Sequence, residues 1–94
     1  MIKLTHDAAA LLTDARAASG APDQYGVRFY VVDTPQQGQA LAFDFVERPE
    51  PQDEVADQEG LPVYVAPELS NIVHDSTLDA KKTDGRAQLV LRSD

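Results

Sequence analysis

The fold is decided by residues 25–47, which read YGVRFYVVDTPQQGQALAFDFVE. Apolar and β-branched side chains recur at every second position from Tyr25 to Val32 and again from Gln39 to Glu47, and this period of two is typical of a β-strand. The segment Thr34–Gly38 separates the two runs, because its proline has no N–H to donate to a ladder and its glycine permits turn dihedrals. We therefore predict two strands joined as a hairpin.

A helix is predicted before this hairpin. Thr5 can cap its first turn, Asp7 lies near the positive end of the helix dipole, and Gly20 followed by Pro22 ends it. Its apolar residues fall at helical spacing and are rich in alanine, so this face can lie close against a sheet. These residues are Ala8, Leu11, Leu12, Ala15 and Ala18.

The segment after the hairpin, from Arg48 to Gly60, carries two prolines and half of the acidic excess. It is predicted to be an exposed connection with at most a short edge strand around residues 54–56. A short apolar strand follows over Leu61–Val65. Pro67 can then begin a helix of about two turns, with apolar positions Leu69, Ile72 and Val73.

Two last strands are predicted over Ser76–Lys82 and Arg86–Leu91. The Asp84-Gly85 pair between them is a strong signal for a tight hairpin turn. We expect residues 1–94 to form a single α+β domain, a small mixed β-sandwich-like structure with one N-terminal helix and one short helix. With 94 residues, of which 43% are hydrophobic, the chain has room for one core.

The charge and the missing cysteines exclude several classes of function. Sixteen acidic against eight basic residues give a net charge of −8, which repels nucleic acid and anionic lipid surfaces. We expect neither as a partner, and the absence of a long apolar stretch predicts a cytoplasmic protein. With no cysteine, the chain cannot form disulfides or hold a metal through thiolates.

Several strings, in their order, resemble the HesB/IscA-like family, the A-type carriers of iron–sulfur cluster biogenesis. They are Ile2–Thr5 leading into Ala8–Ala10, then Gly26–Phe29, Phe43–Asp53, Gly60–Val65 and Ser76–Asp79. The likeness covers nearly the whole chain and implies the fold of that family. The sequence is thus identified as a cysteine-free, degenerate relative.

The resemblance also shows what is missing. Family members have a cysteine in the turn after the first strand of the hairpin, where this chain has Gln36, and a Cys-Gly-Cys near the C-terminus, which has no counterpart before Asp94. One amide oxygen cannot replace three thiolates, which hold iron–sulfur clusters by their charge and softness. We therefore expect no cluster cofactor. The resemblance also makes a homo-oligomer possible, through apolar contact alone.

Histidines, carboxylates and glycine motifs could in principle form a metal site or an active site. His6 and His74 each precede an aspartate and could ligate a metal, but adjacent residues on a helix point in different directions. The acidic segment 44–60 lacks the oxygen pattern and central glycine of a calcium loop. No Gly-x-Ser-x-Gly or nucleotide-binding glycine motif is present, so we expect no enzyme and name no catalytic, cofactor or metal residue.

Two functions stay open. The first is a non-catalytic protein-interaction or accessory module related to iron–sulfur cluster biogenesis, with a protein partner. The second is a small-ligand binder, or a metal binder with oxygen and histidine ligands, on the same fold. The first needs an exposed apolar or acidic patch, whereas the second needs a concave site with converging polar groups.

Overall fold

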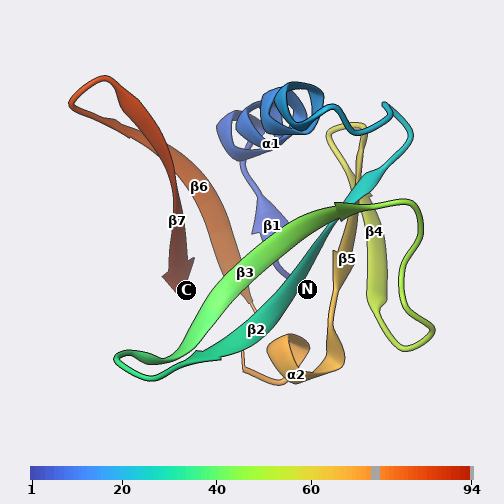
Figure 1. The fold of residues 1–94 in the computed structure, drawn as a ribbon, viewed down its shortest axis with the longest axis vertical. Helices are drawn as coiled ribbons and strands as arrows, with labels where there is room; N and C mark the ends of the chain where they lie inside the picture. Colours follow the sequence, from blue (N-terminus) through green and yellow to red (C-terminus); the bar gives the residue numbers. More distant parts are fainter. Residues whose placement is uncertain (73–74, 94) are drawn as a thin grey trace.

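The computed structural model describes residues 1–72 and 75–93 and shows two β-sheets covered at one end by a helix (Figure 1). The elements in chain order are β1 (Lys3–Leu4), α1 (His6–Ser19), β2 (Gly26–Thr34), β3 (Gly38–Val46), β4 (Glu54–Gln58), β5 (Leu61–Val65), α2 (Pro67–Ser70), β6 (Ser76–Thr83) and β7 (Arg86–Ser93). This mixture of short helices with mixed sheets confirms the predicted α+β class.

The larger sheet has the strand order β3-β2-β5-β4. The hairpin predicted from the opening stretch is confirmed, because β2 and β3 pair antiparallel from Gly26↔Val46 to Thr34↔Gly38. Strand β5 runs parallel to β2 and antiparallel to β4. The acidic segment thus contributes more structure than predicted: β4 continues to Gln58 because it pairs along its whole length with the buried strand β5.

The smaller sheet has the order β1-β6-β7. Its long hairpin is confirmed, with Asp84 and Gly85 both at positive φ, as the tightest hairpin turns require. In Figure 1 this hairpin extends beyond the rest of the molecule. Strand β1 was not predicted, since two residues show no periodicity; it is added parallel to β6 through Lys3↔Thr77 and Leu4↔Leu78.

Helix α1 begins and ends where the sequence predicted. The Thr5 hydroxyl accepts the N–H of Ala8, and Gly20 adopts φ 83° at the C-cap. Helix α2, by contrast, is shorter than predicted. It spans four residues, and Ile72 beyond it is 54% exposed, so no packing extends the helix past Ser70; Val73 lies outside the described residues.

The core lies between the two sheets and α1, and Ile2, Leu12 and Phe29 are among its largest fully buried side chains. The cluster comprises Ile2, Leu4, Ala8, Ala9, Leu12, Val27, Phe29, Leu61, Val63, Val65, Leu69 and Leu78. Small alanines on α1 let this helix approach the sheets closely. No helix in the described part of the chain has the length and apolarity needed to cross a membrane.

Candidate functional site

The turn at the tip of the β2–β3 hairpin is exposed and closed by its own polar groups. The Thr34 hydroxyl accepts the N–H of Gln37 at 3.1 Å and donates to the carbonyl of Gly38 at 3.0 Å. Gln36 lies at this tip and lines a shallow groove of about 270 Å³ together with Thr34, Pro35 and Gln37. The turn is therefore held by hydrogen bonds of its own groups, and its two amide side chains, Gln36 and Gln37, line the groove.

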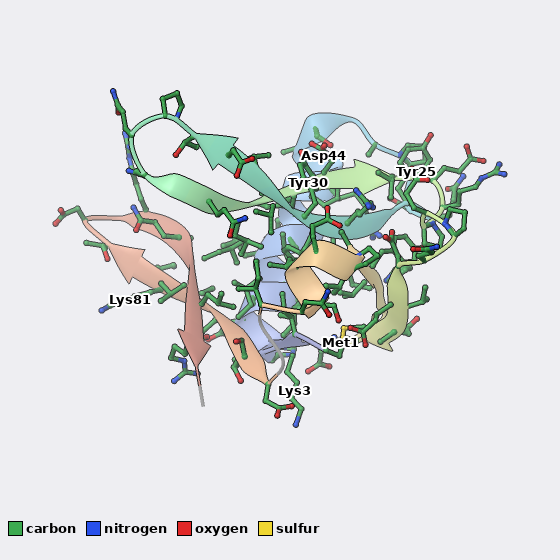
Figure 2. The ribbon with its side chains drawn as sticks, turned by 90° about the horizontal axis from the view of Figure 1, so that it is seen from below. Met1, Lys3, Tyr25, Tyr30, Asp44 and Lys81 are labelled. Atoms are coloured by element: carbon green, nitrogen blue, oxygen red, sulfur yellow. The ribbon has the colours of Figure 1, made fainter. Side chains whose placement is uncertain are left out.

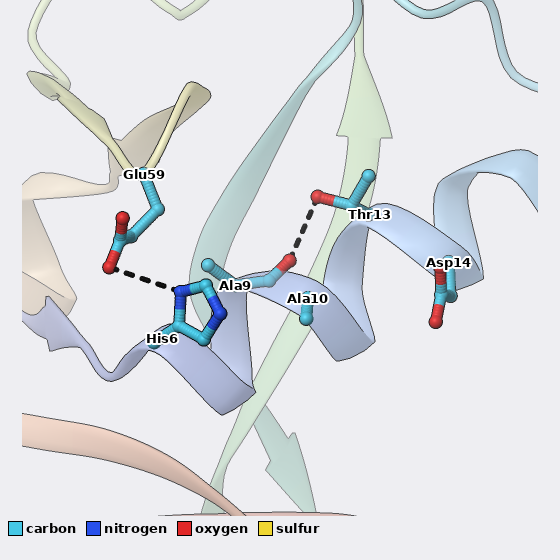
Figure 3. Close-up of a pocket in the computed structure, with 6 residues that line it drawn as sticks. All are labelled: His6, Ala9, Ala10, Thr13, Asp14 and Glu59. Atoms are coloured by element: carbon cyan, nitrogen blue, oxygen red, sulfur yellow. Dashed lines mark hydrogen bonds and ion pairs between the residues drawn. The ribbon is translucent and has the colours of Figure 1, made fainter.

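His6 lies in a separate small pocket beside α1 (Figure 3). Its Nδ1 is 3.5 Å from Oε1 of Glu59, and the two side chains are 81% and 49% exposed. A polar contact so open to water contributes little to stability. Asp14 lies at the far end of the same pocket, of about 240 Å³, away from the imidazole (Figure 3).

The structure does not test a site made by both histidines, because His74 lies outside the described residues. In residues 1–72 and 75–93, no three histidine, aspartate or glutamate side chains come close enough to share a metal ion. The metal hypothesis for residues 44–60 gains no support from the described geometry.

The segment Arg48–Gly60 was expected to be an exposed connection, and for Asp53 this is wrong. The side chain of Asp53 is fully buried and forms a two-pronged ion pair with Arg28 of β2. Asp53 Oδ2 accepts from Arg28 Nε at 2.8 Å, and Oδ1 accepts from Nη2 at 3.1 Å. The backbone N–H of Glu50 donates to Oδ2 at 2.9 Å, which closes the turn before β4.

The ion pair shifts the pKa of both partners toward the charged forms. Burial alone would raise the pKa of Asp53, but the hydrogen bonds from Arg28 and from the Glu50 N–H outweigh it, and the pKa lies below its usual range. The hydrogen bond to Asp53 raises the pKa of Arg28. The pair therefore stays ionised and fixes the β3–β4 loop to the sheet. Sequence reasoning missed it, because the partners are 25 residues apart and nothing local marks them.

The other acidic side chains of this region lie at the surface. The Tyr30 hydroxyl donates to Asp44 at 2.8 Å on the outer face of the β2–β3 hairpin, and this bond raises the pKa of the tyrosine (Figure 2). Glu47 lies 3.5 Å from Arg48 in an exposed pair. These contacts leave an acidic outer surface and show no converging catalytic group.

A second feature that sequence reasoning missed joins the two sheets. The amide of Gln58, at the end of β4, donates to the carbonyl of Ile2 at 2.8 Å and accepts the N–H of Leu4 at 2.6 Å. It thereby occupies the free edge of β1 as a strand neighbour would. Only the parallel addition of β1 to β6 brings these groups together, so no sequence pattern predicts the contact.

Two apolar pockets lie between β3 and β7. One, of about 510 Å³ beside α1, is lined by Leu11, Leu12, Ala15, Phe43, Ala87, Gln88 and Leu89. The other, of about 220 Å³ beside α2, is lined by Val31, Gln39, Ala40, Leu41, Leu69, Ile72 and Leu91. Neither lining set contains a charged residue, which suits an apolar protein contact better than a polar ligand.

Solved structures with the same architecture identify the fold. The chain superimposes on IscA with a [2Fe-2S] cluster at a TM-score of 0.86 and 16% identity, covering 99% of this chain and 85% of that one. The chain has the IscA fold. Escherichia coli SufA, involved in biosynthesis of iron–sulfur clusters, matches at a TM-score of 0.76 and 20% identity over 98% of this chain and 79% of that one.

A protein from Aquifex aeolicus solved by NMR has the IscA fold as well, with a TM-score of 0.76 and 20% identity over 99% of this chain and 91% of that one. No protein-family model and no curated protein sequence matches the chain. The sequence resemblance to the HesB/IscA-like family is thus confirmed at the level of the fold.

The cluster seen in the IscA neighbour does not fit the donor set of this chain. The sequence contains no cysteine, and the hairpin turn offers Gln36, a neutral oxygen ligand. No histidine or carboxylate of the described residues lines the groove at that turn. We therefore derive no step through an iron–sulfur cluster for this protein.

Proposed function

We propose that the protein is a non-catalytic protein-interaction or accessory module related to iron–sulfur cluster biogenesis, which acts without holding a cluster. The observation that carries this proposal is the combination of the IscA fold, at a TM-score of 0.86, with a chain that has no cysteine. Fold does not imply function. The structural neighbours suggest a role related to iron–sulfur cluster biogenesis, whereas the residues of this chain determine whether a cluster can be bound.

The surface supports a protein partner. Phe43 and Leu41 on β3 are each 36% exposed, and each lines an uncharged pocket between β3 and β7. Exposed apolar side chains gathered on one face are typical of protein interaction surfaces. A net charge of −8 adds attraction for a basic partner.

The first test is anaerobic reconstitution of the untagged protein with ferrous iron and sulfide. After desalting, we expect a colourless protein free of iron and sulfide. The IscA neighbour, which was solved with a [2Fe-2S] cluster, is treated in parallel as the positive control. Stoichiometric iron and sulfide retained by this chain would overturn the proposal. Retained iron without sulfide would instead support oxygen and histidine ligands, and would place His6 first among the residues to mutate.

The second test concerns the accessory role. Cluster transfer from loaded SufA to an apo-ferredoxin is followed by absorption, with and without this chain in stoichiometric amounts. We expect the chain to change the transfer rate while retaining no iron itself. An unchanged rate, together with no binding to either protein by calorimetry, would count against a role in this process.

A further inference from the structure

Strand β4 is the last strand at one edge of the larger sheet, next to β5 (Figure 1). The two strands are joined by Glu59 and Gly60, at φ 55° and 79°, which suits a two-residue turn with positive φ at both positions. The residues next to such a turn, here Gln58 and Leu61, form a hydrogen-bonded pair. Hydrogen-bonded and non-hydrogen-bonded pairs then alternate along the antiparallel ladder.

This alternation leaves two residues of β4 with backbone groups that point away from the sheet. Val55 and Asp57 fall in non-hydrogen-bonded pairs with β5, so their N–H and C=O groups face the open side of β4. Pro62, which lies opposite Asp57, agrees with this register, because proline has no N–H to donate to β4. Within residues 1–72 and 75–93, the loop before β4 does not pair with the strand: its backbone hydrogen bond joins the Asp53 N–H to the Glu50 carbonyl.

The side chains around this open edge are apolar and acidic. Val55 is 60% exposed, more than any other large apolar side chain in the described part of the chain. Glu54, Asp57 and Glu59 are exposed, and residues 49–80 contain no lysine or arginine. Such an edge attracts a basic segment with an apolar side chain. A second copy is disfavoured there, because its own β4 would bring acidic side chains against acidic ones.

We propose that the open side of β4 binds an extended basic segment of another protein, which adds antiparallel to the larger sheet as a fifth strand. Segment residues opposite Val55 and Asp57 exchange both backbone hydrogen bonds with them. Because directly opposite side chains share a face of the sheet, an apolar residue opposite Val55 and a basic residue opposite Asp57 are favoured. The proposal rests on the proposed interaction role and names the class of partner. Its test contains no iron–sulfur protein, so either proposal can fail without the other.

The probe is the peptide acetyl-Thr-Lys-Thr-Val-Lys-amide. In the antiparallel register its first lysine lies opposite Asp57, its middle threonine opposite Ala56 and its valine opposite Val55. N-methylation of the valine removes an N–H that points at β4, and we expect binding about tenfold weaker or more. N-methylation of the middle threonine removes an N–H that points away from β4 at the same charge, and is expected to change Kd by less than about twofold.

The contribution of charge is tested on the protein. Asp57→Asn removes the carboxylate opposite the lysine and is expected to weaken binding roughly 1.4- to fivefold. Asp33→Asn, an exposed position on β2, is the matched control with the same change in net charge. Equal effects of the two variants would mean that only the overall charge attracts the peptide, and would overturn the placement at β4.

Binding is measured by NMR titration of the full chain at low salt, where the amide signals of Glu54–Gln58 are expected to shift. Hydrogen exchange of the Val55 and Asp57 amides is expected to be fast in the free protein and slower with peptide, whereas Ala56, bonded to Val63, is protected in both states. No shift at millimolar peptide, or equal losses from the two methylated peptides, would overturn the proposal. Protection of Val55 without peptide would overturn it as well, and a protection that grows with protein concentration would identify a second copy as the occupant.

Discussion

The buried pair of Arg28 and Asp53 gives the sharpest test of the structure. Asp53→Ala removes a carboxylate whose side chain is fully buried and leaves a guanidinium that is 22% exposed. Removing one partner of a buried pair costs about 3–5 kcal/mol when the other stays desolvated. Because Arg28 retains some contact with water, we expect a loss at or just below the bottom of that range, about 2–3 kcal/mol of unfolding free energy.

Urea denaturation at neutral pH measures this loss. For a chain of this size the unfolding free energy falls by roughly 1–1.5 kcal/mol per molar urea. The expected loss of stability therefore lowers the urea midpoint by about 2 M. Asp57→Ala on β4, an exposed carboxylate nearby, is the matched control and is expected to shift the midpoint little. A midpoint for Asp53→Ala that equals that of Asp57→Ala would refute the reasoning.

A double-mutant cycle separates the pair from its surroundings. Arg28→Met alone leaves Asp53 buried and unpaired and is expected to cost as much as Asp53→Ala. The double variant is expected to cost less than the sum, with a coupling of about 1–3 kcal/mol. Additive effects would show that the hydrogen bonds between Nε, Nη2 and the carboxylate contribute nothing specific.

The same pair sets a dependence on pH. The pKa of Asp53 is lowered in the folded state, so its contribution is present above the unfolded pKa of about 3.9 and is lost as the pH falls through the lower folded value. The stability difference between the wild type and Asp53→Ala is therefore expected to stay constant from neutral pH down to about 4 and to shrink below it. A difference that declines already between pH 7 and 5 would mean that burial dominates and raises the pKa.

The remaining predictions concern backbone packing and caps, and each is measured by urea denaturation. Gly26→Ala is expected to cost about 1–3 kcal/mol, since a Cβ there would lie 2.6 Å from the Tyr64 ring; an unchanged midpoint would contradict the packing of these two residues. Gln58→Ala leaves the buried N–H of Leu4 unpaired and is expected to cost about 1–3 kcal/mol, with Gln58→Glu, which keeps the acceptor, in between. Thr5→Ala loses the cap of α1, at about 0.5–2 kcal/mol, whereas Thr5→Ser retains it; equal losses would show that the hydroxyl is unimportant.

Elements with local signals could be predicted from the sequence. Helix α1 has a cap at Thr5 and a glycine at position 20, and both hairpins have alternating strands around a turn. Two elements were not predicted correctly, and the reasons differ. Strand β1 was missed, and α2 was expected to have a second turn. Strand β1 has only two residues, too few to show a period, whereas α2 ends at Ser70 because no packing covers Ile72 beyond it.

Contacts between distant segments could not be predicted in this way. Arg28 and Asp53 each look like ordinary surface residues in the sequence, and a position in an acidic, proline-containing segment favours exposure. Their burial follows from the return of the chain over the sheet after β3, which is set by the parallel pairing of β2 with β5. Gln58 depends in the same way on where β1 joins the smaller sheet.

The IscA fold in a chain without cysteine has a physical explanation in the position of the core. Among the largest buried side chains, Phe29, Leu12 and Leu78 lie on β2, α1 and β6, away from the hairpin turns. The turn with Gln36 is exposed at the tip of a hairpin and is held by Thr34 and the backbone. Substitution there therefore changes ligand chemistry at little cost in folding free energy, so the packing of the core does not determine which side chain stands at position 36.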